Sequence, residues 1–393
     1  MTTSRAGRLL RKPEDPQRAT FLELFFDLAF VYVLTQLSRV LSQDLTWRGA
    51  FHTLVLLLAV WWVWCSTATV PDRFDPQRPT IQLLVIATLV GSLVMAVALP
   101  AVFGAQGLVF AGAYVAVQAG RSIGLLIVLR GHELQRGALR VVIWFCVSAV
   151  PWIAGALVHG TAREALWALA VVIDYLAGKL RYLTPGLGRS PPSELPSAAE
   201  HLAERHRQFF IIALGELILV AASTLGVSGF APDRTAAFLV SIATTVLLWR
   251  IYIYRAGELS ASAIAGSRDP ARLGLSAFYA HLVMVAGVVV AAVGTELVIT
   301  HPFGHPEPAW VAVILGGPAL FLVGRSRFEY VVFSRVSLDR PIGLLALAAV
   351  APLMLLLPPL VAALAVTAVL TGITISDAAR ARGRSPEPPS PPG

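Results

Sequence analysis

The sequence predicts an all-α protein that crosses a membrane many times, a polytopic transmembrane helix bundle of about twelve helices. Three observations predict this fold class. Hydrophobic residues make up 56% of the 393 residues and charged residues only 14%, with a mean hydropathy of +0.71, which excludes an ordinary soluble domain. Apolar runs long enough to span a bilayer recur along the chain. Lys and Arg gather in alternate connections between these runs.

The apolar runs define the expected helices in chain order. The first six are 20–41, 50–70, 80–100, 108–129, 139–158 and 164–183. The second six are 208–226, 235–255, 276–299, 309–330, 341–357 and 359–376. Pro352, Pro358 and Pro359 leave a broken helix or a re-entrant hairpin open for the last two runs.

Positive charge predicts the orientation of the chain. With the amino terminus in the cytoplasm, most of the 31 Lys and Arg residues fall in cytoplasmic segments, and only Arg48, Arg163 and Arg234 fall in outer ones. An even number of spans then places both termini in the cytoplasm. The net charge of +8 reflects this topology and contact with anionic membrane lipids, so it requires no nucleic acid. The first run reads as a signal anchor, because it is too long for a cleavable signal peptide.

The two halves of the chain share short matches in the same order, which predicts two parallel six-helix repeats. The matched pairs are Phe25-Phe26 with Phe209-Phe210, Asp75-Pro76-x-Arg78 with Asp269-Pro270-x-Arg272, Phe103-Gly104 with Phe303-Gly304, Gly120-Arg121-Ser122 with Gly324-Arg325-Ser326, and Arg136 with Arg340. The alternative is that short loops and lipid-facing helices merely share a composition.

This division predicts five segments. They are a basic cytoplasmic N-terminus (1–19), a first six-helix half (20–183), a connector rich in Pro and Gly (184–207), a second six-helix half (208–376) and a disordered cytoplasmic tail (377–393).

Carboxylates inside apolar runs predict the functional site. Glu23 and Asp27 are four residues apart, which places them on one face of the first helix. Arg121 in the fourth run needs a carboxylate partner, and Asp27, Glu23 and Asp174 are the candidates. Glu216 lies near mid-depth of the seventh run. Acids outnumber bases here, so at least one carboxyl must be protonated, hydrated or bound to a cation.

Other polar residues have a supporting role in this hypothesis, and each also has a structural explanation. Thr35 and Gln36 could extend the path outward or simply bond a neighbouring helix. A buried pair of Arg121 with one acid could merely fix helix register. The spacing of His201, Glu204 and His206 matches no established zinc pattern, so we expect no metal site, and no motif indicates a cofactor.

Three segments resemble the bacterial low-temperature-requirement A (LtrA) family of integral membrane proteins: FLELFFDLAFVYVLTQLS, WWVWCSTATVPDRFDP and AERHRQFFIIALGELILVAAS. The resemblance covers nearly the whole chain. The chain differs from the usual family residues at Tyr32, Arg39, His206 and Leu217. The residues kept in register are Glu23, Phe25, Phe26, Asp27, Thr35, Gln36, Glu204, Arg205 and Glu216.

The resemblance implies a multi-pass protein of the bacterial inner membrane, but it carries over no settled activity. The family name implies a link to growth in the cold, which fits a membrane stress response. The acidic positions favour a proton- or cation-coupled transporter or channel-like protein. The alternatives are an intramembrane enzyme acting on a lipid or polyprenyl substrate and a scaffold without catalysis. An enzyme is the less favoured class, because no catalytic motif is found.

Overall fold

The computed structural model describes residues 9–11, 19–191, 199–267, 270–382 and 389–391. This part of the chain is mostly helical, with two isolated β-bridges and no strand. It divides into two compact units, one of residues 1–40 and 51–202 and one of residues 41–50 and 203–393. The all-α fold class predicted from the sequence is therefore confirmed.

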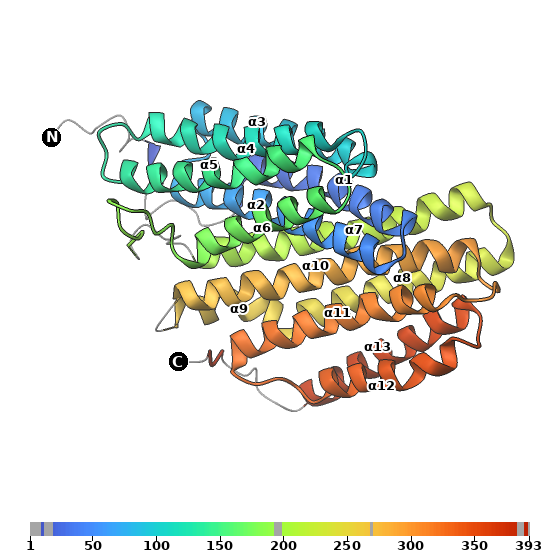
Figure 1. The fold of residues 1–393 in the computed structure, drawn as a ribbon. Helices are drawn as coiled ribbons and strands as arrows, with labels where there is room; N and C mark the ends of the chain where they lie inside the picture. The colour runs from blue at the N-terminus through green and yellow to red at the C-terminus, as the bar shows by residue number, and fades with distance from the viewer. Residues whose placement is uncertain (1–8, 12–18, 192–198, 268–269, 383–388, 392–393) are drawn as a thin grey trace. The chain divides into compact units, whose positions relative to one another are not determined.

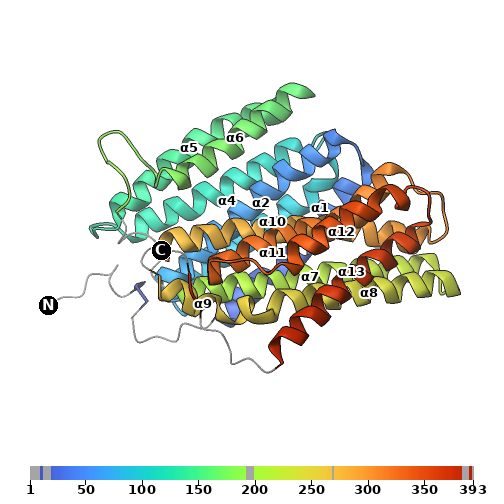
Figure 2. The same ribbon diagram turned by 90° about the horizontal axis from the view of Figure 1, so that it is seen from below.

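The first unit contains the helices of the first half of the chain. These are α1 (Phe21–Gln43, up to Val40), α2 (Trp47–Arg73, from Phe51), α3 (Pro79–Ala98), α4 (Gly107–Val128), α5 (Gln135–Leu157) and α6 (Thr161–Lys179). Helices α3, α4, α5 and α6 pack in chain order, each against the next (Figure 1). Figure 2 shows α5 and α6 side by side. Short connections make such neighbours antiparallel.

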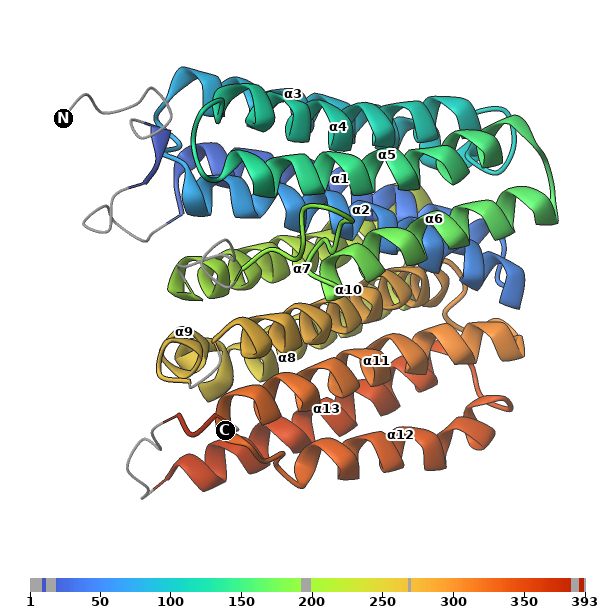
Figure 3. The same cartoon turned by 60° about the vertical axis from the view of Figure 1, so that its left-hand side comes forward.

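The second unit is built around α10 and α11. Its helices are α7 (Ala199–Ser228, from Ala203), α8 (Pro232–Tyr252), α9 (Glu258–Ala265), α10 (Pro270–Thr300), α11 (Pro308–Phe333), α12 (Asp339–Met354) and α13 (Pro359–Ala381). Figure 3 shows α11, α12 and α13 as neighbours, and each of these pairs is in contact. A π-helical turn, Ile253–Gly257, joins α8 to α9.

Proline starts several of these helices. Four helices have a proline in their first turn: Pro79, Pro232, Pro308 and Pro359. N–H groups in the first turn form no intrahelical hydrogen bond, so the absence of an N–H in proline costs nothing there. Pro71, Pro151, Pro318 and Pro352 lie inside helices instead. Membrane helices tolerate such positions because neighbouring groups satisfy the freed carbonyls.

All twelve predicted runs are helical, and α9 is an additional helix. Among the described residues, ten helices are long and apolar enough to cross a membrane, and α6 and α12 are not among them. Helix α12 has only 16 residues, and α6 carries the charged residues Arg163, Glu164, Asp174 and Lys179. The two final runs are separate helices, broken between Met354 and Pro359.

Two boundaries differ from the prediction. Helix α7 begins at Ala199, inside the predicted connector, and α13 continues to Ala381, inside the predicted tail. Residues 192–198 of the connector, 383–388 and 392–393 of the tail, and most of the basic N-terminus lie outside the described residues.

Glycine allows α10 and α11 to approach until their backbones touch. A Cβ atom built on Gly317 would lie 2.5 Å from the Ala291 backbone nitrogen, and one on Gly287 would lie 2.6 Å from that of Phe321. Gly294 and Gly324 face similar backbone contacts at 2.9 and 2.7 Å. We call these four glycines the glycine seam. Small residues at helix contacts are the usual means of close packing in membranes.

Replacing Gly317 with alanine is expected to destabilise the protein by about 1–3 kcal/mol, because the added methyl overpacks a backbone contact. Gly316→Ala is the matched control, since its Cβ would meet nothing within 4 Å. Thermal unfolding in detergent measures both variants. Equal melting temperatures for the two variants would show that the seam is not tightly packed.

Candidate functional site

Asp174 is a buried carboxylate held by neutral donors. It lies on α6 with 2% of its surface exposed. Its Oδ2 accepts a hydrogen bond of 2.7 Å from the Tyr114 hydroxyl on α4 and one of 3.4 Å from the Trp152 indole on α5. Its Oδ1 is buried, and no hydrogen bond to it is found among the described residues. No ion pair involves Asp174 within the described part of the chain.

A line of hydrogen bonds continues from Tyr114 along α4. Gln118, one turn on, donates to the Tyr114 hydroxyl at 3.5 Å, and its carbonyl oxygen accepts from Arg121 Nη2. Arg121 Nη1 donates to the Thr67 hydroxyl of α2 at 2.9 Å. We call Asp174, Tyr114, Gln118, Arg121 and Thr67 the polar chain. It connects three helices of the first unit.

The polar chain corrects the expected pairing of Arg121. The sequence predicted a direct carboxylate partner, but in the described part of the chain the buried guanidinium forms no ion pair and bonds Gln118 and Thr67 instead. It also lies over the Phe145 ring, 5.9 Å from the centroid. Arg121 and Asp174 therefore belong to one network, as opposite charges separated by Tyr114 and Gln118.

Glu23 and Asp27 are both buried on α1. Asp27 Oδ1 accepts a 2.8 Å hydrogen bond from the indole of Trp64 on α2. Glu23 Oε2 accepts from the backbone and the hydroxyl of Thr20, at 2.8 and 2.9 Å, and so closes the first turn of α1. Their burial shows that both acids face the protein interior.

Sequence reasoning missed a buried histidine with two acids. His201, in the first turn of α7 and part of the first unit, lies 2.9 Å from Glu23 Oε1 and 3.5 Å from Asp72 Oδ1. All three side chains are almost wholly buried. We call Glu23, His201 and Asp72 the histidine cluster. The sequence analysis treated His201 only as part of a metal motif, and Asp72 is far from it along the chain.

The remaining predicted residues are distributed over both units. Thr35 donates to the Val31 carbonyl of its own helix at 3.0 Å, and Gln36 is buried with no hydrogen-bond partner for Oε1. In the second unit, Glu216 and Arg205 are fully buried on α7, and Glu204 accepts from Gln208 at 3.0 Å. A site that joins Glu216 to Asp27 and Asp174 stays a prediction.

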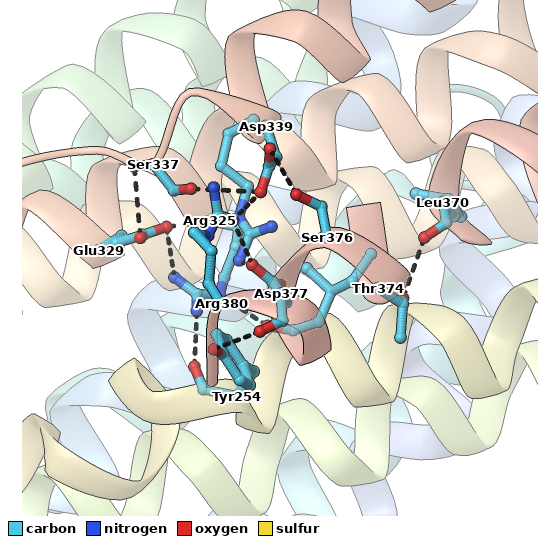
Figure 4. A network of polar contacts seen from close by, with 12 residues as sticks. Tyr254, Arg325, Glu329, Ser337, Asp339, Leu370, Thr374, Ser376, Asp377 and Arg380 are labelled. Carbon is cyan, nitrogen blue, oxygen red and sulfur yellow. Dashed lines mark hydrogen bonds and ion pairs between the residues drawn. The ribbon is translucent and has the colours of Figure 1, made fainter. Parts of the chain in front are cut away.

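The second unit has its own charged network, which we call the ion-pair cluster (Figure 4). It contains three basic and three acidic side chains: Arg325, Arg340, Arg380, Glu329, Asp339 and Asp377. Arg340 lies 2.8 Å from Asp377 and 3.3 Å from Glu329. Arg380 bridges Asp377 and Asp339. Each acid has a base as partner, so the cluster balances its charge internally.

Arg325 also binds the π-helical turn. Its Nε donates to the Ile251 carbonyl at 2.9 Å and its Nη2 to the Tyr254 carbonyl at 2.8 Å. Ile251 lies in the last turn of α8 and Tyr254 in the π-helical turn, so Arg325 bonds both segments. Arg121 on α4 and Arg325 on α11 thus each reach the second helix of their own unit, α2 or α8. This agrees with the predicted repeat, which stays a prediction.

The fold and the buried polar groups define a multi-pass helical membrane protein with ionisable residues in its interior. The family model of the bacterial low temperature requirement A protein (LtrA) matches residues 18–375. The chain therefore belongs to the LtrA family. An uncharacterized protein of Rhizobium meliloti (strain 1021) is 36% identical over 323 residues, which cover 80% of this chain and 78% of that protein. No solved structure gives a significant match.

Proposed function

We propose that this LtrA-family membrane protein moves protons or small cations across the membrane, as a transporter or a channel-like protein. The observation that carries the proposal is the polar chain. It holds an acid, Asp174, and a base, Arg121, inside one helical unit without letting them neutralise each other directly.

The uncompensated charge of the buried Asp174 carboxylate explains why this arrangement favours ion or proton movement. A buried carboxylate without a direct counter-charge costs several kcal/mol, so Asp174 is stable only with a proton or a cation close by. Its Oδ1 suits that role, because it is buried and no hydrogen bond to it is found among the described residues. A pair that served stability alone would instead resemble Arg340 and Asp377, in contact at 2.8 Å.

The polar chain also changes the roles assigned from the sequence. There, Asp27 and Glu216 were the expected carriers, and Glu23, Asp174 and Arg121 were expected to set their charge state. In the present proposal Asp174 is the carrier. Hydroxyl and amide groups link it to Arg121, and such groups both donate and accept hydrogen bonds. Asp27 remains a candidate for a further step of this path within the first unit, and Glu216 remains a separate candidate in the second unit. The proposal places both termini in the cytoplasm.

The test is ion flux in liposomes that contain the purified full-length protein. We expect wild-type protein to dissipate an imposed pH or cation gradient, and Asp27→Asn and Glu216→Gln to slow it, because both remove a buried acid. Flux is recorded with an entrapped pH dye and with ion-selective dyes. The proposal would be contradicted if liposomes with wild-type protein were no more permeable to protons or to any tested cation than protein-free liposomes.

A further inference from the structure

An open cleft of the first unit lies at the end of α4 and α5, apart from the polar chain. It has a volume of about 610 Å³. Its lining residues are Gly131, His132, Glu133, Gln135, Arg136, Leu139, Arg140 and Pro191. Among the described residues that line the cleft are two arginines, one histidine and one acid, so these residues carry more basic than acidic groups.

Local hydrogen bonds leave donors available in the cleft. Nδ1 of His132 accepts the Leu134 N–H at 3.3 Å, so the neutral ring carries its proton on Nε2. The Gln135 carbonyl oxygen accepts the Gly131 N–H at 3.0 Å, which leaves its amide NH₂ as a donor. Gly131 itself has a φ of +77°, which places the loop in a turn that favours glycine.

Arg140 forms the buried base of the cleft. Its Nε and Nη2 both donate to the Leu187 carbonyl, at 3.1 and 2.8 Å, and so fasten the segment after α6 to α5. Arg136, one turn earlier on α5, is exposed at the opening. The exposed guanidinium of Arg136 suits an oxyanion ligand, since guanidinium binds phosphate with several hydrogen bonds.

An exposed apolar stripe continues from this cleft along α5. Ile143, Val147 and Val150 are 36%, 48% and 67% exposed. They follow Arg136 at spacings of 7, 11 and 14 residues, which keeps them on its face of the helix and places them roughly 10–21 Å away along the axis. Helix α5 is one of the ten candidate spans. A cationic cleft at the end of a lipid-facing stripe matches a molecule with an anionic head and apolar tails.

We propose that this cleft binds the phosphate of an anionic phospholipid headgroup, with the acyl chains lying along Ile143, Val147 and Val150. The site does not depend on the proposed ion pathway. Arg136 holds the phosphate, and His132 and Gln135 donate to the headgroup. The lipid favours this site over free phosphate because only the lipid also covers the apolar stripe.

Titration of the full-length protein in detergent with phosphatidylglycerol, phosphatidylcholine or inorganic phosphate tests this site. Native mass spectrometry counts the bound molecules. We expect phosphatidylglycerol to bind more tightly than phosphatidylcholine, and Arg136→Gln to weaken phosphatidylglycerol binding about fivefold, the effect of one basic residue near an anionic lipid. Arg130→Gln is the control, because Arg130 is exposed in the same connection but does not line the cleft.

A second variant separates the lipid from free phosphate. Val147→Ser should weaken phosphatidylglycerol binding, because it removes apolar contact, and leave any phosphate binding unchanged. The lipid assignment would be overturned if inorganic phosphate bound saturably, Arg136→Gln abolished that binding, and phosphatidylglycerol bound no more tightly than phosphatidylcholine. Equal binding of both lipids, or equal effects of Arg136→Gln and Arg130→Gln, would overturn the site.

Discussion

Asp174→Asn is expected to reduce proton or cation flux in liposomes at least roughly tenfold, equivalent to about 1.4 kcal/mol in the barrier. Asparagine has nearly the same shape and its carbonyl oxygen can still accept from Tyr114 and Trp152, so α4, α5 and α6 keep their packing. It cannot hold a proton or balance a cation. The loss should therefore appear in flux and not in the melting temperature.

Two further variants sharpen this test. Asp75→Asn is the matched control, because it makes the same chemical change in a partly exposed pair with Arg78 that contributes little. Tyr114→Phe keeps the carboxyl but removes the hydroxyl that links it to Gln118, so we expect an intermediate loss of proton flux. If Asp174→Asn liposomes conduct as fast as wild type, Asp174 is not on the path.

Asp377→Ala is expected to destabilise the protein by about 3–5 kcal/mol, the usual cost of leaving a buried charge without its partner. Asp377 is in contact with Arg340 and Arg380, and the Arg340 side chain is fully buried. Arg340 would keep only Glu329, at 3.3 Å. Chemical denaturation in detergent, followed by circular dichroism, measures the change in the free energy of unfolding.

The double variant Asp377→Ala/Arg340→Met distinguishes pairing from packing. Removing both charges replaces a buried pair with apolar groups, which is often nearly neutral, so most of the lost stability should return. Asp75→Ala again serves as the partly exposed control and should change stability by less than about 1 kcal/mol. A double variant no more stable than Asp377→Ala would show that the charge pair is not the cause.

Much of the fold follows from hydropathy, because each lipid-crossing helix needs an apolar run of its own. Helix α9 and the π-helical turn were missed for a local reason. Their segment, Ile253–Ala265, is short and interrupted by polar residues, so it has no apolar run of spanning length. Arg325, which is distant in sequence, also bonds this region.

The sequence predicted several residues of the site, but it did not predict which hydrogen bonds they form. Asp174 and Arg121 stand out because charges inside apolar helices are rare, and this needs no structure. Tyr114 and Gln118 do not stand out, since either could pack or bond anywhere along α4. Whether any acid contacts Arg121 depends on helix rotation, which hydropathy does not define. The same holds for His201 and Asp72.

The glycine seam has a mechanical consequence for the second unit. Where backbones of α10 and α11 touch at Gly287, Gly294, Gly317 and Gly324, a shift of one helix along the other would replace glycine with a larger residue at each contact. Such a shift would cause a steric clash at all four glycine contacts at the same time. The two helices therefore act as one rigid body, and any rearrangement of this unit must carry them together.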